Sequence, residues 1–113
     1  FRERTVRPWS LNNIVLVGDA AHTTHYSIGH GTLLAFQDAV ALVDHLKDQP
    51  ALETALNAYE DARRPEVERW QRRGRVSAEW FGNAEQDLSL PLTRFAAGLL
   101  TRGGQITTED QPC

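Results

Sequence analysis

The stretch IVLVGD at residues 14–19 decides the fold of this chain, because four apolar residues in a row are followed at once by a glycine and an aspartate. Four apolar residues without alternation predict a strand that is buried on both faces, as in the parallel sheet of an α/β domain. In such sheets ligands bind beyond the carboxyl ends of the strands, which is where Gly18 and Asp19 stand. The glycine permits close approach of the backbone, and the carboxylate of Asp19 can accept hydrogen bonds from ligand hydroxyl groups.

A glycine-rich loop and a helix are predicted after this strand. The loop runs from Gly18 to Gly31, and the sequence Gly29-His30-Gly31-Thr32 opens the helix. The first amides of a helix have no partner within it, and the helix dipole makes this end positive. We therefore expect this helix start to favour an anion or a group on which negative charge develops.

Apolar residues at helical spacing predict the elements that follow. The first helix is expected to end at Gln49-Pro50, and its apolar stripe comprises Leu33, Phe36, Val40, Val43 and Leu46. A second helix is predicted over residues 51–64, Pro65 is expected to kink or break it, and residues 66–81 continue the helical pattern. A short helix over residues 88–100 and a polar tail over 103–113 complete the chain.

Two features predict that this chain is one part of a longer protein. It begins with Phe1 and contains no methionine. One strand followed by helices cannot close a parallel sheet, because the hydrogen-bonding edges of the strand would stay open. We therefore expect an α/β fragment in which residues 1–83 are the C-terminal part of a larger domain, residues 84–102 a terminal helical segment, and residues 103–113 a flexible tail or linker.

The composition excludes several classes of protein. The chain has 113 residues, and 12 basic against 15 acidic side chains give a net charge of −3, whereas a general nucleic-acid binder would carry a basic excess. No apolar run approaches the roughly 20 residues that cross a membrane. The single cysteine, Cys113, excludes an internal disulfide, so a reducing cytoplasm is the expected setting.

The motifs of the loop and helix together resemble a known family. Gly18-Asp19-Ala20-Ala21-His22 is followed by Gly29-His30-Gly31, by Ala35 and by Asp38-Ala39. This pattern resembles the second FAD fingerprint of class A FAD-dependent aromatic monooxygenases, the superfamily of p-hydroxybenzoate hydroxylase. The strings at residues 25–32 and 99–102 are most similar to the hydroxylases of aromatic acyl-CoA thioesters, such as salicylyl-CoA and 2-aminobenzoyl-CoA hydroxylases.

The resemblance implies a Rossmann-like FAD-binding fold and a set of cofactor contacts. Asp19 would hydrogen-bond a hydroxyl of the ribityl chain, and the amides near the helix start would face the pyrimidine end of the flavin. The residues implied in cofactor binding are Gly18, Asp19, Ala20, Gly29, Gly31, Thr32 and Leu33. The resemblance assigns no catalytic residue to this chain, because the flavin carries the chemistry with NAD(P)H and O2.

Two departures from the family pattern bear on the substrate. The family most often has Pro-Pro at His25-Tyr26 and asparagine at Leu33. His25 and Tyr26 are therefore candidates for contact with an aromatic substrate. The Gly-x-Gly-x-x-Gly motif that binds ADP in this family does not occur in the chain, so the remainder of the parent chain would have to supply it.

Three alternatives remain open at this point. His22, His25 and His30 with Asp19 could bind a metal. Because the loop contains no cysteine or glutamate, we expect no metal there. Six arginines between Arg63 and Arg75 face only two glutamates, which is typical of a salt-bridged helix face but would also suit a non-catalytic interaction module or the phosphates of CoA. The third alternative is that the parent protein is a reductase or halogenase of the same fold. His22 by itself is interpreted as a loop histidine that bonds a backbone carbonyl.

Overall fold

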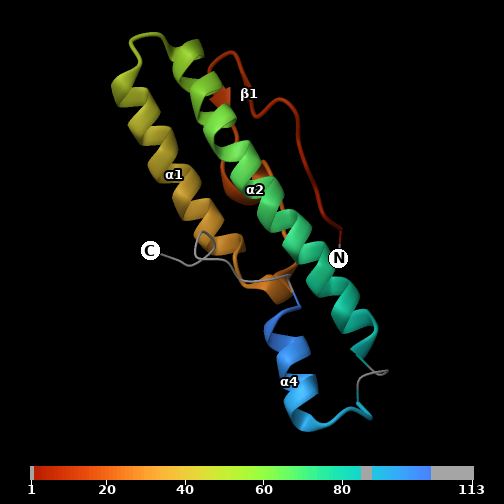
Figure 1. Cartoon of the computed structure of the whole chain (residues 1–113). Helices are drawn as coiled ribbons and strands as arrows, with labels where there is room; N and C mark the ends of the chain where they lie inside the picture. The colour runs from red at the N-terminus through yellow and green to blue at the C-terminus, as the bar shows by residue number, and fades with distance from the viewer. Residues whose placement is uncertain (1, 85–87, 103–113) are drawn as a thin grey trace.

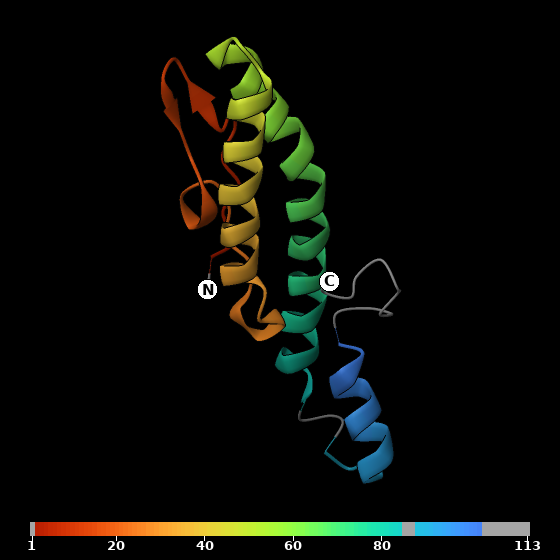
Figure 2. The ribbon, with the colours of Figure 1, turned by 90° about the vertical axis from the view of Figure 1, so that its left-hand side faces the viewer.

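The computed structural model describes residues 2–84 and 88–102 as a pair of long helices with an N-terminal segment along one face (Figure 1). Seen from the side in Figure 2, the N-terminal hairpin and the loop that follows it lie on one side of the helices. The elements are β1 (Ser10–Leu11), β2 (Ile14–Val15), the 3₁₀ turns η1 (Gly18–Ala20) and η2 (Tyr26–Ile28), and the helices α1 (Gly31–Asp48), α2 (Leu52–Gly82) and α4 (Leu92–Leu100).

The predicted strand is shorter than expected and pairs differently. β2 pairs antiparallel with β1, with Ser10 opposite Val15 and Leu11 opposite Ile14, and the side chain of Ile14 is 66% exposed. Asn12 has φ +57°, so residues 12 and 13 form a tight turn that favours this hairpin. The described residues thus combine strands and helices, but their sheet has two antiparallel strands and is not the predicted parallel sheet.

The N-terminal segment is fixed along the loop that contains the Gly-Asp motif. The Val6 amide donates to the Ala21 carbonyl at 3.1 Å, and the Thr23 amide donates to the Arg4 carbonyl at 3.0 Å. Further along the segment, the amide of Trp9 donates to the Glu60 carboxylate of α2 at 2.6 Å. These contacts hold the loop between the N-terminal segment and the helices.

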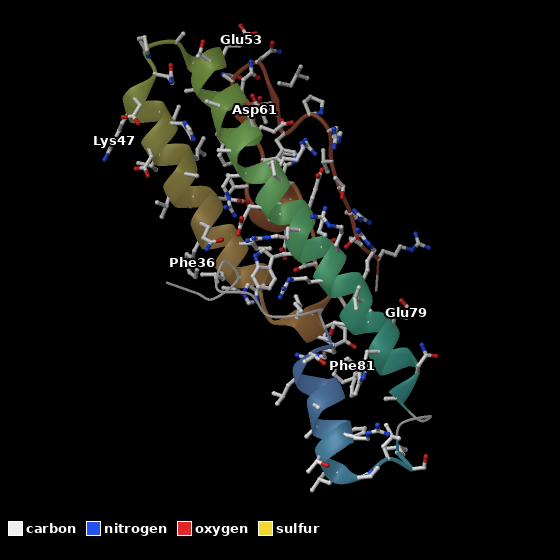
Figure 3. All side chains as sticks on the ribbon, viewed as in Figure 1. Phe36, Lys47, Glu53, Asp61, Glu79 and Phe81 are labelled. Carbon is white, nitrogen blue, oxygen red and sulfur yellow. The ribbon has the colours of Figure 1, made fainter. Side chains whose placement is uncertain are left out.

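Helix α1 begins and ends where the sequence predicts, but its core face is a different one. The buried residues of α1 are Leu34 and Asp38, and Ala41 and Leu42 pack against the core. The predicted stripe of Leu33, Phe36, Val40, Val43 and Leu46 is exposed along its whole length. Figure 3 shows Phe36 on the side of α1 that faces away from α2. The periodicity was therefore helical, as predicted, but within the described residues nothing covers this stripe.

Helix α2 is one continuous helix of 31 residues, so of the predicted kink or break at Pro65 the break is wrong. Proline removes one backbone donor and crowds the preceding turn. Side chains on both sides of Pro65 are buried, among them Tyr59 and Arg63 before it and Val67 and Trp70 after it. Tertiary packing therefore outweighs the local effect of the proline.

The last described element, α4, begins at Leu92 with Pro91 as its N-cap, four residues later than predicted. Trp80 near the end of α2 contacts Phe95 of α4, with their rings 5.6 Å apart. The predicted tail at residues 103–113 lies outside the described residues. Among the helices of the described ranges, none is both long and apolar enough to cross a membrane.

The main core lies where the two long helices meet the N-terminal segment. It comprises the buried residues Trp9, Ala21, Leu34, Tyr59, Val67 and Trp70. The hydroxyl of Tyr59 donates to the carbonyl of Leu16 at 3.0 Å, which ties α2 to the segment between β2 and η1. This core therefore positions the turn that carries the Gly-Asp motif.

Candidate functional site

Turn η1 packs directly on α1. Gly18 has φ +64°, and a Cβ added to it would lie 3.0 Å from the Cβ of Ala35. A side chain at this position would be strained by its backbone conformation and would press closely on α1. Glycine is thus favoured here, while the side chain of Asp19 lies exposed beside it.

The first turn of α1 has no side-chain cap. His30 is the N-cap residue and makes no capping hydrogen bond with its side chain, and the Leu34 amide donates to the His30 carbonyl at 2.9 Å. The amides of Gly31, Thr32 and Leu33 therefore precede the helical ladder, at the positive end of the helix dipole. An acceptor atom with partial negative charge is favoured at this position.

A cavity of about 490 Å³ joins the turn and the helix start. The residues that line it come from η1, from the loop after it and from the first turns of α1: Asp19, Thr23, Thr24, Tyr26, Gly29, Gly31, Thr32 and Ala35. Of the residues predicted to bind cofactor, Asp19, Gly29, Gly31 and Thr32 are thus brought together. Gly18 is buried behind the lining, and Ala20 and Leu33 are exposed without lining this cavity.

The polar groups of this cavity suit a cofactor such as FAD, which carries both hydroxyl groups and a ring edge of carbonyl acceptors. Asp19 offers a carboxylate to hydroxyl donors, and the start of α1 offers amides to acceptors. The hydroxyl of Thr24 is buried and has no hydrogen-bond partner among the described residues. Such a group is expected to find a partner in a ligand or in water, because an unpaired buried hydroxyl is costly.

Next to turn η1, the buried carboxylate of Asp38 accepts hydrogen bonds from three donors. Asp38 Oδ2 accepts from the Gly18 amide at 3.0 Å and from His22 Nε2 at 2.5 Å. Asp38 Oδ1 accepts from Arg63 Nε at 2.8 Å. Because an ionised carboxylate can only accept, His22 must carry its proton on Nε2 in this arrangement. The interpretation of His22 as a partner of a backbone carbonyl is thereby corrected.

The pKa of Asp38 is lowered by this arrangement. Burial alone would raise the pKa, but the hydrogen bonds from His22, Arg63 and the Gly18 amide outweigh it. The same buried charge acts on Tyr59, whose pKa is raised by burial and then by the negative charge of Asp38. Asp38 is therefore ionised at neutral pH, as an acceptor for all three donors.

The three histidines of the loop do not come together as a metal site. His22 bonds Asp38, His25 Nδ1 lies 2.5 Å from the hydroxyl of Ser27, and the ring of His30 stacks on Trp70 at 3.5 Å. In the described part of the chain, no three side chains of histidine, cysteine, aspartate or glutamate form a group that could hold a metal ion.

A second cavity of about 540 Å³ lies between η2 and the end of α2. His25, Tyr26, Ser27, Ala78, Phe81 and Gly82 line it. Tyr26 belongs to the linings of both cavities, and its ring stacks on His25 with the centroids 4.4 Å apart. The two residues predicted to contact substrate are therefore together, at the boundary between the cavities.

Ion pairs account for much of the arginine surplus on α2. Arg64, Arg69 and Arg75 pair with Glu60, Glu66 and Glu3 at 2.6, 2.8 and 2.5 Å. Arg63 is buried against Asp38, and Arg73 lies over the ring of Trp70 at 5.2 Å. These contacts agree with the salt-bridged helix face that the sequence favours.

Asp38 and Arg63 are the site residues that the sequence did not reveal. Asp38 belongs to the motif that carries the resemblance, but the motif does not indicate its partners, and Arg63 is one of six arginines in its stretch of the chain. One signal was present: Ala35 and Asp38 are three residues apart, so both lie on the face of α1 that meets the turn. The pairing with Arg63 could not be seen, because it joins two different helices.

Comparison with known proteins places the chain in a family. Residues 1–73 match the family described as FAD binding domain. The chain is 56% identical over 110 residues to the 3-hydroxy-4-methyl-anthranilyl-(aryl-carrier protein) 5-monooxygenase of Streptosporangium sibiricum, covering 97% of this chain and 30% of that protein. It is 42% identical over 117 residues to the salicyloyl-CoA 5-hydroxylase of a Streptomyces species, covering 97% of this chain and 22% of that protein.

A third relative, which matches a shorter stretch of the chain, agrees with these two. The kynurenine 3-monooxygenase of Salinispora tropica is 45% identical over 67 residues, which are 57% of this chain and 15% of that protein. The chain thus spans less than a third of the length of each of these relatives. The chain belongs to the FAD binding domain family, and its resemblance to FAD-dependent aromatic monooxygenases is confirmed.

Proposed function

We propose that this chain is the C-terminal part of an FAD-dependent monooxygenase that hydroxylates an aromatic acyl group held as a thioester. The family match and the monooxygenase relatives support the cofactor and the reaction class. The names of two relatives support the substrate class, because one describes an aromatic acyl group on an aryl-carrier protein and the other an aromatic acyl-CoA.

The parent protein would be organised as the sequence predicts. Residues 1–83 would complete a Rossmann-like FAD-binding domain, whose parallel sheet comes from the remainder of the parent chain. Residues 84–102 would form the terminal helical segment and residues 103–113 a tail or linker. The single cysteine supports a cytoplasmic setting.

The observation that carries the proposal is one cavity lined by both Asp19 and the start of α1. Asp19 would accept a hydrogen bond from a ribityl hydroxyl of FAD. The amides of Gly31, Thr32 and Leu33 would face the pyrimidine edge of the flavin, where the helix dipole stabilises negative charge. Gly18, Ala20 and Gly29 have small side chains or none, which would keep the backbone close to the cofactor.

The overall reaction would be the monooxygenation of an aromatic C–H bond. An aromatic C–H compound, O2, NAD(P)H and H⁺ yield the phenol, water and NAD(P)⁺, so one oxygen atom enters the ring and the other leaves as water. FAD, when bound, supplies the electron transfer and the activation of O2. The residues of this chain would bind and orient the cofactor, and we expect none of them to react covalently.

His25 and Tyr26 would contact the aromatic substrate. They line the cavity that adjoins the Asp19 cavity, and Tyr26 is 78% exposed, so a planar ring could stack on it. Replacing Tyr26 with alanine is therefore expected to raise the KM for the aromatic thioester.

The test of the proposed function uses the purified parent protein with FAD, NAD(P)H and isotopically labelled O2. Salicyloyl-CoA is the first substrate, and free salicylate is the matched control that lacks the thioester. We expect one labelled oxygen atom in the aromatic product from the thioester, detected by mass spectrometry. Oxidation of NAD(P)H without a labelled product from any aromatic thioester would contradict the substrate class.

A further inference from the structure

Asp38 is a buried carboxylate that contacts the candidate FAD site only through other residues. Its side chain is fully inaccessible to solvent, and it receives hydrogen bonds from η1, from the loop after η1 and from α2. A buried charge is costly unless it is paired and hydrogen-bonded, and replacing a buried ion pair with apolar residues is often neutral for stability. This cluster therefore suggests a role beyond holding the helices together.

Asp38 holds the Gly-Asp turn at both of its ends. The same oxygen, Oδ2, accepts from the Gly18 amide and from the His22 ring. Backbone bonds close the turn between these points, since the amides of Ala21 and His22 both donate to the Gly18 carbonyl, at 2.9 and 3.0 Å. Asp19 lies inside this closed loop, so its direction depends on where the two ends are held.

Helix α1 supplies both the support and the second half of the site. Ala35, three residues before Asp38, lines the cavity and touches the position where a Cβ of Gly18 would be. The same helix presents its first amides to the cavity. Asp38 thus fixes the distance between the carboxylate of Asp19 and the start of α1, and Arg63 fixes the rotamer of Asp38 by holding Oδ1.

We propose that Asp38 is a positioning residue for FAD, which sets the direction of Asp19 by holding Gly18 and His22 against α1. Arg63 supports this role from α2. The inference rests on the proposed function, because it assumes that Asp19 and the start of α1 contact FAD. What it adds is that the binding of FAD depends on an acceptor oxygen at residue 38 and not on the charge of the buried pair.

Two double variants of the parent protein separate the acceptor from the charge. In Asp38→Asn with Arg63→Gln both charges are removed, but an amide oxygen can still accept from Gly18 and His22. In Asp38→Ala with Arg63→Met both charges and the acceptor are removed, and the apolar side chains do not leave an unpaired ion. A third double variant, Glu66→Gln with Arg69→Gln, removes another ion pair of α2, whose residues line neither cavity.

The dissociation constant of FAD and the visible absorption spectrum of bound flavin are measured for each variant, and urea unfolding shows that each one folds. We expect the Asn/Gln variant and the Glu66 control to bind FAD within about threefold of the natural parent. We expect the Ala/Met variant to bind at least tenfold more weakly, about 1.4 kcal/mol, with a shifted spectrum.

Two results would overturn the proposal: equal weakening in the Asn/Gln and Ala/Met variants, or unchanged FAD binding in a folded Ala/Met variant. If the Ala/Met variant does not fold, Asp38→Ser with Arg63→Gln takes its place, since the shorter hydroxyl side chain withdraws the acceptor from Gly18. Failure of the proposed function itself would be distinct, because the natural parent would then bind no FAD.

Discussion

Gly18 and Gly29 are two glycines with positive φ in very different surroundings. Gly18 has φ +64° and faces the Cβ of Ala35, whereas Gly29 has φ +70° and would have no atom within 4 Å of an added Cβ. Left-handed backbone costs a residue with a side chain roughly 1–2 kcal/mol, and overpacking adds about 1–3 kcal/mol. We predict that Gly18→Ala lowers the free energy of unfolding of the parent protein by at least about 1 kcal/mol more than Gly29→Ala.

Urea unfolding of the two variants gives this difference directly, because the cost of the positive φ is common to both. The affinity for FAD should follow the same order, since the Gly18 variant displaces the turn that carries Asp19. Equal losses of stability in the two variants would show that η1 does not pack on α1 as closely as 3.0 Å.

At the scale of single residues, the sequence predicted residues that line one cavity and not the buried ion pair of Asp38 and Arg63. Asp19, Gly29, Gly31 and Thr32 could be predicted because the spacing of glycines and of one carboxylate is a local property. Asp38 and Arg63 are 25 residues apart and meet only when α1 and α2 pack. A buried ion pair of this kind has no local signature, since each partner by itself resembles a surface residue.

At the scale of elements, Glu60 and Asp38 make the packing of α2 dependent on pH. Burial would raise the pKa of Glu60, but its hydrogen bonds from Arg64 and from the Trp9 amide lower it, and the pKa of Asp38 is lowered as well. The unfolded chain, with ordinary values of 4.5 and 3.8, therefore binds protons at a higher pH than the folded chain. The stability that these groups contribute is present above those values and is lost as the pH falls below them.

We predict that the free energy of unfolding of the parent protein decreases as the pH is lowered from about 4.5, and that Glu60→Gln makes this decrease less steep. Urea unfolding at a series of pH values measures both slopes. An identical slope for the variant would mean that Glu60 has no depressed pKa in the folded protein.

Element boundaries were predictable where a local signal dominates, and not where packing decides. Helix α1 ends before Gln49-Pro50 as predicted, because the residue before proline disfavours helical backbone. At Pro65 the same local rule failed, because buried residues on either side keep α2 continuous. The hairpin was missed because the apolar run at residues 14–17 outweighed the turn signal of Asn12 and Asn13.

At the scale of the whole molecule, the described chain is elongated and leaves an apolar face of α1 uncovered. It measures 58 × 28 × 16 Å, with a radius of gyration of 17.0 Å, whereas a compact domain of about 100 residues has one of about 13 Å. Phe36 and Val40 lie in the centre of the uncovered stripe, with exposures of 68% and 63%. We expect the remainder of the parent chain to cover it.

Phe36→Lys should therefore have opposite effects in the chain alone and in the parent protein. In the chain alone the lysine removes exposed apolar surface, so light scattering should show less self-association. In the parent protein it should lower the free energy of unfolding by roughly 1.5–3 kcal/mol, the value of burying one large apolar side chain. Thr54→Lys, at an exposed position of α2, adds the same single positive charge and is the control. No loss of stability in the parent protein would mean that the stripe stays exposed there.

The family and the cofactor class were predictable from the sequence because the fingerprint over residues 18–39 is contiguous. The parallel sheet that the apolar strand was expected to join could not be described from this chain, since its neighbouring strands would lie in other parts of the parent protein. The helical period of α1 was correct, but the choice of its buried face requires knowledge of both of its neighbours. Within the described residues α1 has a neighbour on one side, formed by α2 and the N-terminal segment, and none on the side of the exposed stripe.

The central claim is that Asp19 binds FAD, and the most direct test is the affinity of the parent protein for FAD with Asp19 replaced. Asp19→Ala is compared with Asp44→Ala, which removes another exposed carboxylate, from α1 outside the cavity lining. A hydrogen bond to an ionised group contributes about 1.5–3 kcal/mol, so we predict that Asp19→Ala weakens FAD binding at least tenfold, while Asp44→Ala leaves it unchanged and both variants fold. A full complement of FAD, bound with unchanged affinity by the Asp19→Ala protein, would contradict the account.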